Sequence, residues 1–63
     1  MYNPTIEDRT FNLLRQHGPL EPADVARRLE VKLATVNKAL EMLRQERVVK
    51  QVGKGKEEWT VSL

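Results

Sequence analysis

Apolar residues recur at helical spacing through the first two thirds of this chain, and the period shortens to two near its end. Glycine and proline divide the helical part. Asn3 or Thr5 is placed to cap a first helix, which Gly18 and the proline after it end. Pro22 takes the first position of a second, short helix that ends near Glu30.

A third helix is predicted over residues 33–46, after a connection of about three residues. Val36, Ala39, Leu40 and Leu43 share one of its faces at a period of about 3.6 residues. Residues 48–52 and 58–63 then have the composition and alternation of strands. The loop between them contains two glycines and is typical of a hairpin.

Two helices joined by so short a connection have the spacing of a helix-turn-helix, and a hairpin directly afterwards adds a wing. We therefore expect an α+β fold, a winged helix-turn-helix with three helices followed by a two-stranded β-hairpin wing. Residues 1–63 are expected to form a single winged-helix domain. A short extra strand around Leu20 is expected to join the sheet, and the third helix is expected to be the recognition helix.

The size and composition of the chain exclude several classes of protein. A core of 63 residues is marginal, because a short chain leaves much of its surface in water. The chain has no cysteine and one histidine, His17, so neither a disulfide nor a zinc site is expected to reinforce it. The lack of cysteine fits an intracellular protein. No apolar run approaches the roughly 20 residues that span a bilayer, and we expect no membrane partner.

Positive charge is concentrated in the second half of the chain. Residues 1–26 carry a net charge of −2 and residues 27–63 a net charge of +4. Such asymmetry is typical of a protein with one face that meets a polyanion. Arg27, Arg28 and Lys32 begin the basic half, in a region that approaches the DNA backbone in winged helices. A favourable interaction with the C-terminal dipole of the second helix accounts for them equally well.

The outer face of the third helix holds the main candidates for nucleic-acid contact. The Asn37 amide can contact a phosphate or a base, and the Lys38 ammonium can neutralise a phosphate. Arg44 and Gln45 can reach the flanking backbone. Glu41 stands among them, where it repels phosphate, accepts a hydrogen bond from a cytosine amino group, or pairs with Lys38 or Arg44. Glu41 is also consistent with a face that binds something other than nucleic acid, and the alternative for the other four residues is a solvated helix surface.

The hairpin adds a second set of candidates. Lys54 and Lys56 alternate with Gly53 and Gly55 at its tip. Glycine lets the backbone approach a phosphate closely, and each lysine can release one counterion. The alternative is a soluble, mobile loop. Trp59 belongs to the alternating apolar side of the last strand, so we expect it to pack beneath the wing against the third helix.

Two family resemblances are present. Residues 31–43 resemble the recognition segment of bacterial and archaeal winged-helix regulators, although Glu30 and Lys32 stand where those families place glycine and a helix-capping serine or threonine. Residues 36–40, which read VNKAL, resemble the Zalpha family, whose winged-helix domains bind left-handed Z-DNA and Z-RNA. That resemblance implies contacts from Asn37 and Lys38 to the zigzag phosphates. It also implies that Trp59, 22 positions after Asn37, touches the nucleic acid with its edge.

Three departures from the Zalpha pattern reduce the resemblance. Glu41 replaces the family's tyrosine, which packs on an exposed base of the left-handed duplex. Lys56 and Glu57 replace a proline pair in the wing, and Leu33 replaces a lysine at the helix start. A divergent family member fits these departures, and so does an ordinary winged helix that shares the Asn-Lys pair by chance.

The sequence therefore predicts a module that binds double-stranded DNA or RNA through phosphate-dominated contacts, with left-handed duplexes as a Zalpha-like target. No catalytic constellation is present, so we expect no enzyme activity, cofactor, metal or small-molecule substrate. Two alternatives remain: a transcriptional regulator that binds right-handed DNA, and a winged-helix module that binds protein partners without nucleic acid. The predicted contact residues are Lys32, Asn37, Lys38, Glu41, Arg44, Gln45, Lys54, Lys56 and Trp59.

Overall fold

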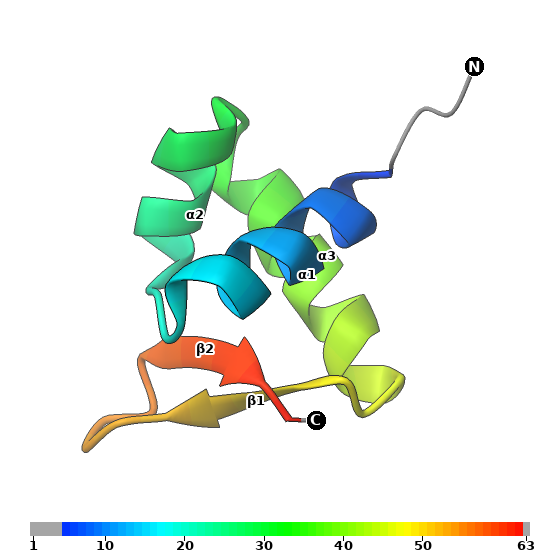
Figure 1. Ribbon diagram of the computed structural model, residues 1–63. Coiled ribbons are helices and arrows are strands. Elements are labelled where there is room, and N and C mark those ends of the chain that lie inside the picture. The colour runs from blue at the N-terminus through cyan, green and yellow to red at the C-terminus, as the bar shows by residue number, and fades with distance from the viewer. Residues whose placement is uncertain (1–4, 63) are drawn as a thin grey trace.

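The structure is a computed structural model that describes residues 5–62. Three helices precede an antiparallel hairpin, in the order α1 (Ile6–His17), α2 (Pro22–Leu29), α3 (Leu33–Gln45), β1 (Val49–Val52) and β2 (Glu58–Val61). Figure 1 shows α1 crossing in front of α3, with the hairpin running beneath the helices. This arrangement confirms the predicted winged helix-turn-helix. Asn3 and Leu63, which belong to the predicted first cap and last strand, lie outside the described residues.

The helix ends follow local chemistry. Thr5 caps α1, because its hydroxyl accepts a hydrogen bond of 3.2 Å from the Asp8 backbone N–H. Gly18 ends α1 with a φ of 83°, a conformation that glycine adopts readily. Glu30 ends α2 in the left-handed conformation, at φ 58° and ψ 47°. Lys32 precedes α3 and makes no side-chain capping bond. Glu30 therefore occupies a turn conformation that suits the glycine of other winged helices, and Lys32 does not cap α3 as their serine or threonine does.

The predicted ends of three elements were wrong by one or two residues. Helix α3 ends at Gln45, one residue early, and β1 begins at Val49, one residue late. The cause is the turn between them, in which the Val48 N–H donates to the Leu43 carbonyl and Arg47 takes a φ of 64°. Strand β2 ends at Val61.

The core lies between the three helices and the inner side of the hairpin. The whole apolar stripe predicted for α3 is buried in it. Leu14 of α1 and Val25 of α2 are fully buried beside that stripe, and Trp59 of β2 is only 6% exposed. Burial of these side chains is the main force that holds so short a chain in one structure.

Trp59 also connects the wing to the helices through its backbone. It lies opposite Gln51 in the hairpin, and on its other side it forms an isolated bridge with Leu20. The Leu20 N–H donates to the Trp59 carbonyl at 3.0 Å, and the Trp59 N–H donates back at 2.8 Å. This bridge confirms the extra strand predicted around Leu20, reduced to one residue pair. The hairpin is thus fixed to the segment between α1 and α2.

Candidate nucleic-acid interface

The outer face of α3 is a polar surface centred on Glu41. On a helix, residues three and four positions apart lie on the same side. Four of the predicted contact residues stand at these spacings from Glu41, and all five side chains are exposed. We call this set the α3 face: Asn37, Lys38, Glu41, Arg44 and Gln45.

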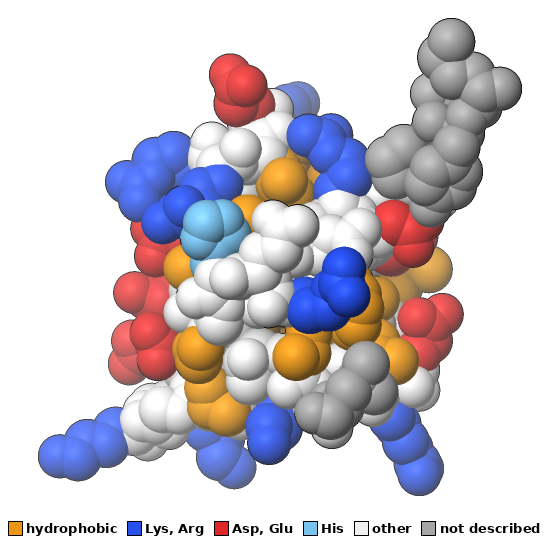
Figure 2. Space-filling model, viewed as in Figure 1, with side chains coloured by type: hydrophobic (Ala, Val, Ile, Leu, Met, Phe, Trp, Pro, Cys, Tyr) orange, Lys and Arg blue, Asp and Glu red, His pale blue; other side chains and the backbone are white. Residues whose placement is uncertain are grey.

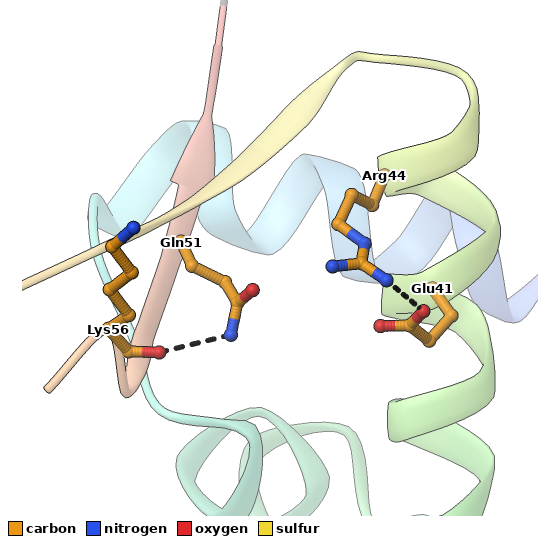
Figure 3. A network of polar contacts seen from close by, with 4 residues as sticks. All are labelled: Glu41, Arg44, Gln51 and Lys56. Carbon is orange, nitrogen blue, oxygen red and sulfur yellow. Dashed lines mark hydrogen bonds and ion pairs between the residues drawn. The ribbon is translucent and has the colours of Figure 1, made fainter.

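The α3 face is directed toward the side on which the wing lies. Glu41 and Arg44 project from α3 toward the hairpin, and Gln51 projects from the hairpin toward α3 (Figure 3). An Arg44 guanidinium nitrogen lies 2.6 Å from Oε2 of Glu41, which makes an ion pair at i,i+3 spacing. Of the pairings open to Glu41 from the sequence, the structure therefore contains the one with Arg44.

The wing tip, residues 53–56, is a tight and exposed turn. Its backbone is closed by a hydrogen bond of 3.1 Å from the Lys56 N–H to the Gly53 carbonyl. Lys56 has a φ of 53°, in the left-handed region. The Lys54 and Lys56 side chains are both exposed. The two lysines predicted to contact phosphate are therefore presented at the end of the hairpin.

Gln51 is a residue that the sequence analysis missed. Its side-chain amide donates a hydrogen bond of 3.0 Å to the Lys56 carbonyl and so ties β1 to the wing tip (Figure 3). Gln51 pairs across the hairpin with Trp59 and lies two residues from the buried Val49. By the alternation of a strand, it is on the inner side of the hairpin. The alternation of β1 was the sequence signal that could have placed Gln51 on that side.

Trp59 is buried on the inner side of the wing, in the core cluster that includes residues of α3, while its strand β2 packs chiefly against α1. Its burial and its membership of the core cluster confirm the structural role. Contact between its edge and a nucleic acid stays a prediction. Lys32 is exposed directly before α3, and Leu33, the first residue of α3, is 47% exposed.

Charges of both signs surround the wing. Figure 2 shows Lys and Arg side chains projecting along the edge formed by the hairpin and acidic side chains at the flank where α2 and the hairpin meet. Glu21, Glu57 and Glu58 line a shallow hollow of about 220 Å³ there, together with Lys54. The positive potential of the wing tip is therefore reduced on its α2 side.

Within residues 5–62, no three His, Cys, Asp or Glu side chains are grouped so that they could bind a metal ion. No helix in that part of the chain has the length and hydropathy to cross a bilayer.

Comparison with known proteins places this geometry in a family. The chain matches no protein-family model and no curated protein. Among solved structures, the apo-Zalpha domain of zebrafish PKZ is similar with a TM-score of 0.81 and 32% sequence identity, over 92% of both chains. The chain belongs to the Zalpha family. The Zalpha domain of PKZ from Carassius auratus, crystallised in complex with Z-DNA, also has a TM-score of 0.81, with 23% identity over 89% of this chain and 90% of that one.

Within this Zalpha domain, the departures from the family pattern are gathered around the α3 face and the wing. Glu41 lies at the centre of the α3 face and is paired with Arg44. Lys56, in place of a proline, adopts the left-handed conformation, which a proline ring cannot enter. The wing tip therefore has a different backbone from one that contains proline at this position.

Proposed function

We propose that this Zalpha-family domain binds double-stranded nucleic acid with the α3 face and the wing tip, and that it prefers the left-handed form. The observation that carries the proposal is the exposure of Asn37 and Lys38 one turn before Glu41, a residue that projects toward the hairpin (Figure 3), together with the burial of Trp59 in the core. The Z-DNA complex of the Carassius auratus domain supports the left-handed preference.

Phosphate contacts supply most of the affinity in this proposal. Lys38, Lys54 and Lys56 are exposed and form no ion pair within the described residues. Each lysine that engages a phosphate releases a condensed counterion, with a slope of about −0.9 per phosphate in a plot of log K against log salt. Three such contacts give a slope of about −2.7, which corresponds to about 40-fold weaker binding between 50 and 200 mM salt.

The left-handed preference follows from contacts that read the backbone rather than base edges. Phosphate contacts position a protein and carry no base identity, so the path of the phosphates decides which duplex fits. Asn37 and Lys38 are adjacent on α3, and Trp59 holds the hairpin to the shared core and to Leu20 between α1 and α2. The distance between the two sets of contacts is therefore constant, and one backbone geometry suits it better than another.

Two measurements test the proposal. Duplex binding at increasing salt concentration is expected to weaken with the slope given above, and a lack of binding at low salt would refute nucleic-acid binding. Circular dichroism of an alternating CG duplex tests the handedness. The spectrum is expected to convert to the left-handed form on addition of the domain, and an unchanged right-handed spectrum would contradict the preference.

A protein-binding role is the second candidate, and exposed Leu33 favours it. This apolar side chain stands at the start of α3 beside Lys32. An NMR shift titration with right-handed and left-handed duplexes separates the candidates. Shifts that cluster on the α3 face and the wing tip support nucleic-acid binding, and the duplex with the larger shifts identifies the form. No shifts with either duplex would favour a protein partner.

A further inference from the structure

The α3 face contains a single acidic residue, and that residue is at its centre. Glu41 is the only carboxylate in α3. Asn37 and Lys38 lie one turn before it, and Arg44 and Gln45 lie one turn after it. A duplex that contacts this face through Asn37 and Arg44 together must pass over the Glu41 carboxylate.

We infer that Glu41 limits the affinity of the proposed interface by occupying Arg44 in the free domain. The inference rests on the proposed function, because it concerns the same surface. The guanidinium nitrogen and Oε2 of Glu41 are 2.6 Å apart, as short as the shortest charge-assisted hydrogen bonds. A carboxylate and a phosphate compete for the same planar set of donors on arginine. A phosphate therefore engages Arg44 by displacing Glu41.

The exposure of the pair makes this exchange accessible to a ligand. The Arg44 and Glu41 side chains are 51% and 49% exposed. Exposed ion pairs are weak, so the pair opens at little cost. After the exchange, however, the Glu41 carboxylate is left beside the phosphate with no cation of its own. Arg44 differs in this respect from Lys38, Lys54 and Lys56, which form no ion pair within residues 5–62.

Salt dependence distinguishes this arrangement from simple repulsion. A lysine that forms no ion pair in the free domain breaks none when it binds a phosphate. Arg44 already has Glu41 as its counterion, so its engagement contributes less to the net release of salt ions. Neutralising Glu41 should therefore strengthen binding and also steepen the salt slope. If Glu41 acted by repulsion alone, neutralising it would strengthen binding to the same extent whether or not Arg44 is present.

The experiment is a double-mutant cycle with Glu41→Gln and Arg44→Gln, measured by fluorescence anisotropy on an alternating CG duplex at several salt concentrations. Glu41→Gln is expected to bind about five- to tenfold tighter, with a slope steeper by up to about 0.9. Arg44→Gln is expected to weaken binding by a larger factor in the Glu41→Gln background than in the unaltered domain. Circular dichroism checks that each variant is folded.

Asp24→Asn on α2 is the matched control. Asp24 forms an ion pair of 2.5 Å with Arg27 at the same i,i+3 spacing. The control changes the net charge by the same amount and frees Arg27, which is not among the predicted contact residues and lies on α2 rather than on the α3 face. We expect an affinity change below about twofold and an unaltered slope. An equal gain from Asp24→Asn, or an equal gain from Glu41→Gln with and without Arg44, overturns the inference while the unaltered domain still binds. Absence of binding by the unaltered domain overturns the proposed function and the inference together.

Discussion

Replacement of Lys56 by glycine is expected to stabilise the domain and, at the same time, to weaken its binding to a duplex. Lys56 has a φ of 53°, where a residue with a Cβ atom pays about 1–2 kcal/mol. Glycine avoids that cost but loses about 0.5–1 kcal/mol through the greater freedom of its unfolded chain. The contacts that define the turn use the Lys56 backbone N–H and carbonyl, so both survive the substitution. The net gain is about 0.5–1 kcal/mol.

Thermal unfolding followed by circular dichroism measures this gain. A domain of this size shifts its Tm by about 4–8 °C for 1 kcal/mol, so Lys56→Gly should raise Tm by about 2–8 °C. The same variant lacks one cation of the wing tip. Its duplex affinity should fall at low salt, and its salt slope should become shallower by about 0.9.

Lys56→Ala separates the two effects. Alanine removes the charge but keeps the Cβ atom in the left-handed conformation. It should lose duplex affinity as glycine does, without the rise in Tm. The backbone argument is refuted if alanine raises Tm as much as glycine. The phosphate contact is refuted if neither variant alters the salt slope.

Two further predictions concern stability. Glu30→Gly should raise the free energy of unfolding by about 0.5–1 kcal/mol in a denaturant titration, because Glu30 ends α2 at φ 58°. Glu30→Ala keeps the Cβ atom, and an equal gain from alanine would show that the cause is charge. Thr10→Val should raise the same quantity by about 1 kcal/mol, because Oγ1 of Thr10 is fully buried with no hydrogen-bond partner in the described structure. Thr10→Ser keeps the hydroxyl and removes a methyl group, so it should be destabilised by about 1 kcal/mol; stabilisation by serine would contradict this reasoning.

The proposed surface combines attraction with internal neutralisation. The lysines of α3 and the wing carry the attraction. The Glu41–Arg44 pair reduces the positive charge within the α3 face, and the carboxylates around the hollow beside Lys54 reduce it next to the wing tip. A surface of this kind binds a polyanion less tightly than its number of cations suggests, because carboxylates neutralise some of them. Single substitutions can remove these carboxylates.

The sequence by itself determined the order of the elements and the buried side of each helix. The α3 stripe of Val36, Ala39, Leu40 and Leu43 is buried as its period predicts. Gly18 marks the end of α1 because glycine readily adopts a positive φ, and Pro22 marks the start of α2 because its ring fixes φ and removes an N–H donor. The exposure of Asn37 and Lys38 follows from the same period. All of these are local properties, set by residues within one or two turns of each other.

Only the tertiary structure decided the arrangement of the polar groups. Glu41 has two cations within reach on α3, and side-chain geometry selects Arg44. Gln51 reaches the Lys56 carbonyl because the hairpin register places it opposite Trp59, on the inner side. The bridge between Leu20 and Trp59 fixes the hairpin to the segment between α1 and α2. Rotamers, strand register and docking depend on atoms distant in the chain, so no local pattern encodes them.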